Sequence, residues 1–89
     1  MEEDTTNQPK TMEKRPLTFG EDAVGLTFNP SNNIEVDEIK KRYAEIIDIL
    51  DGIRSCDESD RHPEKNRLLS VAITEAQTAQ MWAVKGITK

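Results

Sequence analysis

The 89-residue chain contains very little of what usually stabilises a small protein. It has one cysteine, Cys56, and one histidine, His62. A disulfide needs two cysteines, so a disulfide within the chain is excluded. A structural zinc site needs four ligands, mostly cysteine or histidine, so the composition argues against one. A chain this short buries only a small core, and small domains without such links often depend on self-association. The sequence therefore predicts a homo-oligomer, and a lone thiol in an acidic chain indicates a reducing compartment.

Long apolar runs and an excess of positive charge are also missing. No run approaches the ~20 apolar residues that a membrane-spanning helix needs, and the start, Met-Glu-Glu-Asp, is the reverse of a signal peptide. The chain has 17 acidic and 12 basic residues, a net charge of −5. A nucleic-acid-binding domain normally has a basic face and a high pI. We expect a cytoplasmic protein with no membrane, DNA or RNA partner.

Groups for catalysis are equally sparse. The sequence has no nucleophile–base pair and no cluster of metal ligands at a recognisable spacing. Gly20 and Gly25 are too isolated to form a glycine-rich phosphate loop. We therefore expect neither an enzyme nor a bound metal or cofactor.

The chain divides into a tail, an arm and a helical region. Residues 1–16 have almost no apolar content and are expected to form a disordered polar tail. Residues 17–33 alternate apolar side chains with glycine and proline, which indicates a mostly irregular arm that docks on the rest of the protein, or else a partly ordered linker. The apolar residues of this arm are Leu17, Phe19, Val24, Leu26 and Phe28.

Two helices are predicted in residues 34–89. In residues 34–54, apolar residues recur at spacings of three and four, the pattern of a helix–helix seam: Val36, Ile39, Tyr43, Ile46, Leu50 and Ile53. Asn32 and Glu35 form a plausible capping pair at its start. In residues 62–88, the same spacing selects small residues: Leu69, Ala72, Ala76, Ala79, Ala83 and Gly86. The short link favours antiparallel neighbours, so the predicted fold is an all-α hairpin.

Both helices have further apolar residues outside the two seams, and these indicate an interface. Ile47 and Ile49 widen the stripe of the first helix, and the second helix has its own surplus at Leu68, Ile73, Val84 and Ile87. Exposed apolar surface of this kind usually marks a binding surface. Symmetric self-assembly is the simplest partner.

One face of the second helix has no acidic residue. With Ala72 on the seam, the opposite pole holds hydroxyl, amide and thioether groups, and cations lie along its edge. The residues are Arg67, Ser70, Thr74, Gln77, Thr78, Met81 and Lys85. Such a face suits phosphates and nucleobases, but small polar residues also pack well in a second interface of a helical oligomer.

The basic residues 40–42 also allow two interpretations. Acidic neighbours surround it, so pairing at a spacing of four residues explains much of it, and contact with a phosphate is the alternative. Tyr43 fits the core of the seam. Trp82 could stack on a base or lie in a helical interface.

Two stretches, GLTFNPSNNIEVDEIKKRYAEIIDIL and RLLSVAITEAQTAQMWAVKGITK, resemble a known family. They are similar to the phage hairpin-domain proteins of the anti-CBASS (type two) and Thoeris anti-defence (type one) group. The resemblance covers roughly residues 24–89, and ITEAQTAQMWAVK is its most specific part. It implies a helical homo-oligomer, typically a hexamer. It also implies a sponge that sequesters cyclic di- and trinucleotide immune messengers in the infected bacterial cell without degrading them.

The resemblance also implies site residues. An aromatic residue of the arm and a lysine of the first long helix would bind a cyclic dinucleotide, and Phe28 and Lys40 match these positions. An arginine and a hydroxyl residue near the start of the second helix would bind a cyclic trinucleotide. Arg67 and Thr74 match them, with Ser70 as a possible substitute. The alternative is an oligomeric adaptor that docks another protein and has no small-molecule ligand.

Overall fold

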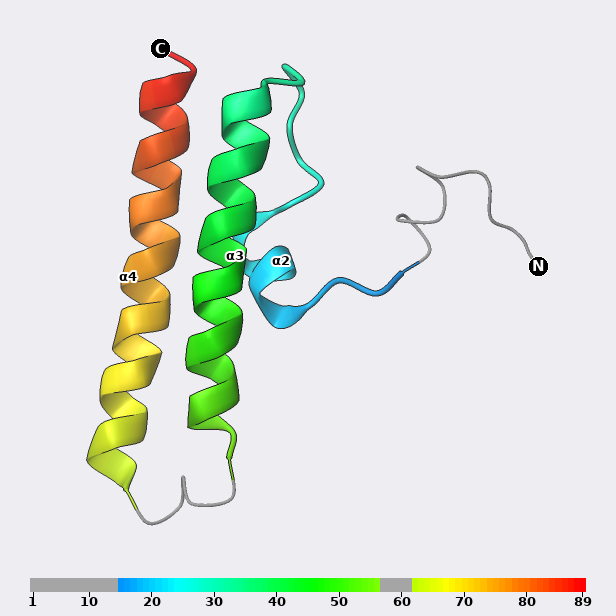
Figure 1. Cartoon of the computed structure of the whole chain (residues 1–89). Helices are drawn as coiled ribbons and strands as arrows, with labels where there is room; N and C mark the ends of the chain where they lie inside the picture. Colours follow the sequence, from blue (N-terminus) through cyan, green and yellow to red (C-terminus); the bar gives the residue numbers. More distant parts are fainter. Residues whose placement is uncertain (1–14, 57–61) are drawn as a thin grey trace, which may run out of the picture.

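A computed structural model describes residues 15–56 and 62–89 of the chain (Figure 1). Across these residues the secondary structure is entirely helical: α2 (Phe19–Val24), α3 (Ile34–Arg54) and α4 (Pro63–Ile87). Helices α3 and α4 run antiparallel, side by side, so the predicted helical hairpin is confirmed. Residues 1–14 of the predicted tail lie outside the described residues. None of the described helices is both long enough and apolar enough to cross a membrane.

Both long helices begin at residues that commonly start helices. The Asn33 side chain caps α3, because its Oδ1 accepts hydrogen bonds from the N–H groups of Glu35 at 2.7 Å and Val36 at 3.2 Å. The prediction that Asn32 is the cap was wrong by one residue. Asn32 instead has a φ of 54°, the left-handed conformation that asparagine tolerates in turns. Pro63 occupies the first turn of α4, where its missing N–H has no helical partner to lose.

The arm is more ordered than its sequence indicated. It contains α2, which begins with a reciprocal capping box: Glu21 N donates to Thr18 Oγ1, and Thr18 N donates to Glu21 Oε1, both at 3.0 Å. Gly25, with a φ of 64°, ends the helix in the left-handed conformation. The rest of the arm is irregular, as predicted, but the sequence analysis did not predict the short helix Phe19–Val24. These two terminal signals were present in the sequence, but a helix of under two turns has no apolar periodicity to accompany them.

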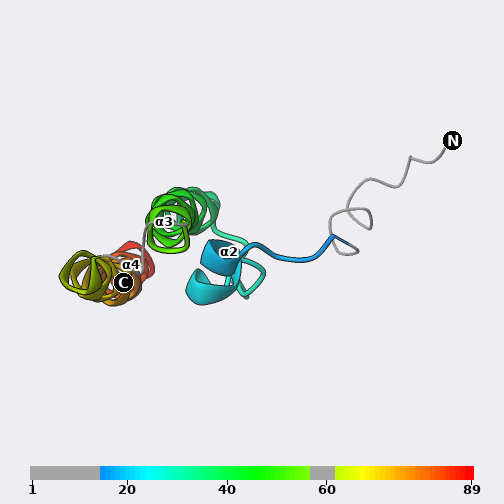
Figure 2. The same ribbon diagram turned by 90° about the horizontal axis from the view of Figure 1, so that it is seen from below.

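Helix α3 is packed on two sides. Seen along the hairpin, α2 and α4 flank α3 at different positions around its axis (Figure 2). One cluster of buried residues takes one residue from α2, two from α3 and one from α4: Val24, Ala44, Ile47 and Ile73. A hydrogen bond of 3.4 Å from Gln77 Nε2 to the Ala23 carbonyl links α4 to α2.

The predicted seams agree with the observed packing only in part: Val36 is buried, and Tyr43, Leu50 and Ala76 pack against the core. On α3 the buried positions are Val36, Lys40, Ala44 and Ile47, whereas Ile46 and Ile53 of the predicted seam are exposed. On α4 the buried positions are Ile73 and Gln80, whereas Ala79 and Gly86 are exposed. For α3 the physical reason is that it packs against two helices, α2 and α4. The buried face of α3 therefore differs from the stripe that would face a single partner helix.

The capping box of α2 makes a pH-dependent contribution to stability. Arg15 donates to both carboxylate oxygens of Glu21, at 2.9 and 3.2 Å. This interaction, followed by the Thr18 N–H bond, holds the pKa of Glu21 below its ordinary value of 4.5. Because the pKa is lower in the folded state, the stabilisation is complete above pH 4.5 and is lost as the pH falls through the lowered pKa.

We therefore expect Glu21→Gln to remove part of the acid dependence of stability. The free energy of unfolding of the parent, minus that of the variant, should be largest near pH 6 and should shrink as the pH falls from 4.5 to 3. Urea titrations at each pH measure both values. Taking the difference cancels the other carboxylates, and a difference that does not change with pH would contradict the expectation.

Candidate functional site

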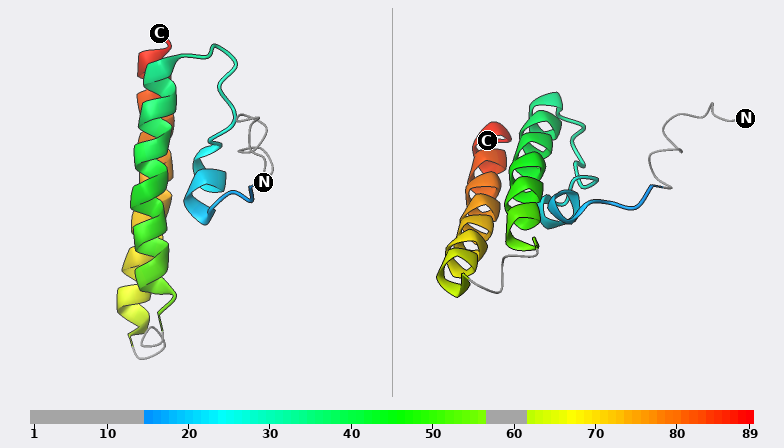
Figure 3. Two further views of the ribbon diagram at one scale, coloured as in Figure 1. Left: turned by 45° about the vertical axis from the view of Figure 1, so that its right-hand side comes forward. Right: turned by 60° about the horizontal axis from the view of Figure 1, so that its bottom comes forward.

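Phe28 and Lys40 lie in contact. The segment between α2 and α3 runs back along α3 (Figure 3), and Lys40 Nζ donates hydrogen bonds to two of its carbonyl oxygens, Gly25 at 3.0 Å and Phe28 at 2.5 Å. The same ammonium group lies 5.5 Å from the centroid of the Phe28 ring, within the range of a cation–π interaction. The structure thus brings together the two residues that the sequence proposed for a dinucleotide site.

The two side chains differ in exposure. Lys40 is 5% exposed, whereas Phe28 is 69% exposed. Burial lowers the pKa of Lys40 below its ordinary value of 10.5, and the negative charge of Asp37 opposes this shift. The carbonyl oxygens replace part of the water that the ammonium group has lost. Lys40 is therefore an internal group, and Phe28 is the exposed member of the pair.

A groove of about 310 Å³ adjoins this pair. That volume is at the lower end of the range for small-molecule sites, roughly 300–1,000 Å³. The groove is lined by the arm, the first half of α3 and the end of α4. Its residues are Phe28, Asn29, Pro30, Ser31, Val36, Lys40, Val84 and Thr88. The contribution of Val84 and Thr88 was not foreseen from the sequence, because it depends on the antiparallel register of α3 and α4.

The residues proposed for a trinucleotide site lie on the first half of α4, away from the groove. Arg67 is exposed and paired with Glu64, with Nη2 and Oε2 2.6 Å apart. This hydrogen bond raises the pKa of Arg67 and lowers that of Glu64. Thr74 is exposed, and its carbonyl oxygen accepts a hydrogen bond from Thr78. Exposed pairs of this kind contribute little to stability, so Arg67 can exchange its partner readily.

Ser70 is half-buried and is bound by a residue that sequence reasoning missed. Arg54, in the last turn of α3, donates from Nη1 to Ser70 Oγ at 3.0 Å and from Nη2 to Asp51 Oδ1 at 2.7 Å. Its guanidinium group also lies 5.5 Å from the centroid of the Phe19 ring. Arg54 thereby connects α2, α3 and α4. The sequence offers no signal for this contact beyond a basic residue at a helix C-terminus.

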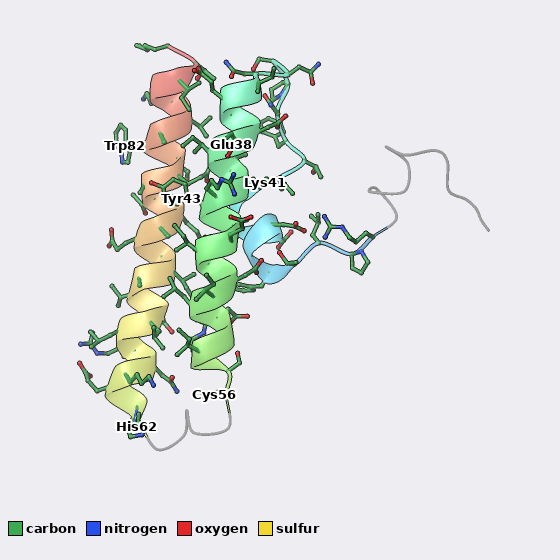
Figure 4. All side chains as sticks on the ribbon, viewed as in Figure 1. Glu38, Lys41, Tyr43, Cys56, His62 and Trp82 are labelled. Carbon is green, nitrogen blue, oxygen red and sulfur yellow. The ribbon has the colours of Figure 1, made fainter. Side chains whose placement is uncertain are left out.

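The polar face expected on α4 is therefore only partly a solvent face. Ser70 and Gln77 are half-buried and bond to Arg54 and Ala23, so packing against α3 and α2 accounts for them. Thr74, Thr78 and Met81 are exposed. Trp82, 66% exposed, projects away from the hairpin, and Lys85 Nζ lies 5.5 Å from its ring centroid (Figure 4).

The basic run of α3 separates into three different environments. Arg42 pairs with Glu38 at 2.6 Å and with Glu45 at 3.2 Å, so the predicted pairing at four-residue spacing is confirmed for Arg42. Lys40 is buried under the arm, and Lys41 is exposed. Within the described ranges, no group of three or more His, Cys, Asp or Glu side chains is placed to hold a metal ion.

The family model described as "Acb2/Tad1, hairpin domain" matches residues 21–88. The match begins inside α2 and ends one residue after α4, so it includes the groove and the Arg67 region. No curated protein and no solved structure is detectably similar to the chain. The matched family is known for anti-defence and consists of binding sponges rather than enzymes. The match covers well over half of the chain, and the protein belongs to the Acb2/Tad1 hairpin-domain family.

Proposed function

We propose that this protein sequesters cyclic di- or trinucleotide immune messengers without cleaving them, and thereby blocks anti-phage signalling in a bacterial host. The observation that carries the proposal is the exposed Phe28 ring beside the groove, adjacent to the buried ammonium group of Lys40. A base can stack on an aromatic ring, and one such contact contributes roughly 1–3 kcal/mol in single-stranded nucleic-acid sites.

In this proposal the two halves of α4 bind different ligands. The groove at Val84 and Thr88 would take a cyclic dinucleotide, with Phe28 as the stacking platform. Arg67, Ser70 and Thr74 would take a cyclic trinucleotide, for which Arg67 supplies a charge that can pair bidentately with a phosphate. We propose that both sites bind their ligand reversibly and do not cleave it, since neither contains a nucleophile next to a general base.

The exposed apolar side chains favour a homo-oligomer. Large apolar side chains are exposed along α3 and α4 of one protomer, and burying them between copies would stabilise a chain with so small a core. They are Ile34, Ile46, Ile49, Ile53, Leu68, Val71, Met81 and Trp82. We propose that protomers associate through these side chains, and a hexamer is the state that the family resemblance implies.

Calorimetry with a panel of cyclic di- and trinucleotides tests the function. We expect at least one compound to bind and to be recovered intact by chromatography after release. A cyclic dinucleotide that binds should bind Phe28→Ala about 5- to 150-fold more weakly, the equivalent of the ~1–3 kcal/mol of one stacking contact. Phe28→Tyr keeps the ring and should retain the affinity. Arg67→Glu should weaken only trinucleotide binding, because it places a negative charge against a phosphate.

Light scattering on the same samples gives the oligomeric state. A Kd above about 10 μM for every compound, near −7 kcal/mol, would contradict the sponge function and favour the oligomeric adaptor. A stable folded monomer at micromolar concentration would contradict the proposed assembly.

A further inference from the structure

We infer that Arg54, at the end of α3, binds a phosphate of the cyclic trinucleotide together with Ser70. This inference rests on the proposed function and adds a binding residue to one of its two sites. The residues that the sequence proposed for that site all lie on α4. With Arg54, the site takes residues from both long helices of the hairpin.

Arg54 and Ser70 meet where the end of α3 lies beside the first half of α4 (Figure 1). Arg54 Nη1 donates to Ser70 Oγ at 3.0 Å, and Nη2 donates to Asp51 Oδ1 at 2.7 Å. The centroid of the Phe19 ring lies 5.5 Å from Arg54 Cζ, within the range of a cation–π interaction. Three helices therefore hold the guanidinium group in one position in the free protein, which lowers the entropy cost of binding a ligand.

The Ser70 hydroxyl has a hydrogen to offer a ligand. Serine and threonine hydroxyls in helices often donate to the carbonyl oxygen four residues earlier. The hydroxyls of Thr78 and Thr88 do so, at 3.1 and 2.9 Å. The Ser70 hydroxyl instead accepts from Arg54, and among the described residues it donates to no acceptor. Because Ser70 is only half-buried, a ligand can reach it.

The guanidinium group also has donors that the protein does not use. It has five N–H groups; one donates to Ser70 and one to Asp51, and the others find no acceptor in the part of the chain that the structure describes. The Arg54 side chain is 28% exposed. Arg54 and Ser70 thus present N–H and O–H donors beside a positive charge. The group that fits them is an anionic oxygen, such as that of a phosphate.

Arg67 adds a second cation next to this pair. It lies three residues before Ser70 on α4, and residues at that spacing are neighbours on a helix surface. Its partner Glu64 is exposed, so Arg67 can exchange that carboxylate for a phosphate. A cyclic trinucleotide has more than one phosphate, and two arginines can contact two of them. The groove proposed for a dinucleotide is lined by the start of α3 and the end of α4, at the other end of the hairpin.

A first experiment needs no cyclic nucleotide. Sodium pyrophosphate is titrated into the protein at constant ionic strength, and NMR follows the Arg54 side-chain N–H signals and the Ser70 amide. We expect saturable shifts of these signals in the parent and in Arg42→Met, and no saturable shift of the Ser70 amide in Arg54→Met. Arg42 is the matched control because it also lies on α3 and is paired with two carboxylates, those of Glu38 and Glu45.

The parent protein decides this experiment even if Arg54→Met fails to fold. A parent in which pyrophosphate causes no saturable shift at Arg54 would overturn the inference. The same Ser70 shift in a folded Arg54→Met protein would also overturn it, because the anion would then bind without Arg54.

A second experiment measures the Kd of cyclic tri-AMP by calorimetry at several salt concentrations. Arg54→Met should weaken binding at least about tenfold, the usual effect of losing a hydrogen bond to a charged group. It should also reduce the salt slope by roughly one charge. Arg54→Lys should keep the slope but not the full affinity, since lysine lacks the planar pair of donors. Arg42→Met should bind as the parent does.

Ser70→Ala tests the hydroxyl in the same titrations. It should weaken the binding of cyclic tri-AMP without changing the salt slope, because it removes a neutral donor. The binding of a cyclic dinucleotide should be the same in the parent, Arg54→Met and Ser70→Ala.

The opposing interpretation is that Arg54 only fastens the three helices together. In that case Arg54→Met would lower the free energy of unfolding but keep the parent's salt slope and its affinity for cyclic tri-AMP, and this result would overturn the inference alone. A parent that binds pyrophosphate at Arg54 but no cyclic nucleotide would contradict the proposed function and support Arg54 and Ser70 as a phosphate site.

Discussion

Gly20→Ala should separate α2 from α3 and destabilise the protein by about 1–3 kcal/mol or more, the usual cost of overpacking a well-packed site. A Cβ atom at residue 20 would clash with the backbone carbonyl oxygen of Ala44 and would lie 2.9 Å from Asp48 Oδ1. Backbone atoms of a long helix cannot move aside as a flexible side chain can. The shift would also break the 2.7 Å hydrogen bond from Gly20 N to Asp48 Oδ1.

Gly52→Ala is the matched control, because nothing lies within 4 Å of the Cβ that it would add in α3. Alanine is favoured over glycine inside a helix, so this variant should gain roughly 0.5–1 kcal/mol. Urea titrations of both variants, followed by circular dichroism, measure the changes in the free energy of unfolding. A Gly20 variant as stable as the parent would mean that α2 does not pack closely on α3.

Ile47→Ala should cost about 2–5 kcal/mol, the typical cost of truncating a buried isoleucine to alanine. Ile47 is 0% exposed and lies in the core cluster with Val24, Ala44 and Ile73. Its removal leaves a cavity that three helices border, so no single helix can move to fill it. A domain of this size has a free energy of unfolding of only about 5–15 kcal/mol, and such a loss would lower the melting temperature strongly.

Ile49→Ala is the control for this prediction, since Ile49 lies two residues away and is 63% exposed in the protomer. Melting temperatures are compared at several protein concentrations. Ile47→Ala should be destabilised at every concentration. A loss in Ile49→Ala that depends on concentration would report on assembly, and equal, concentration-independent losses in both variants would contradict the observed core.

The helical hairpin was predictable because long amphipathic helices repeat their signal. Several turns of apolar residues at three- and four-residue spacing, with Pro63 at a helix start, are sufficient to place α3 and α4. Helix α2 has six residues, too few for a periodic pattern. Only the capping residues Thr18 and Glu21 and the terminal Gly25 mark it.

The buried face of each helix was less predictable than the helix itself. Periodicity selects a stripe but cannot distinguish a helix with one neighbour from a helix with two. Ala79 fits the stripe of α4 and is exposed, while Gln80 fits a polar face and is buried. The tertiary packing of the helices decides this, through contacts between residues far apart in the sequence.

The candidate site was also predictable only in part. The family resemblance indicated Phe28 and Lys40, and the structure adds that the lysine is enclosed by the carbonyl oxygens of the arm. The bond between Arg54 and Ser70 joins residues on different helices, and no local pattern anticipates it.

The fold class, the two long helices and the lack of a disulfide within the chain could all be inferred from the residues alone, because they follow from composition and from interactions between residues close together in the chain. Which face of each helix is buried became evident only from the packing of the three helices, as did the burial of Lys40 and the exposure of Phe28. The physical reason is that burial and hydrogen-bond partners depend on distances through space. The Lys40 side chain reaches the carbonyl oxygen of Gly25 because the arm runs back along α3 (Figure 3).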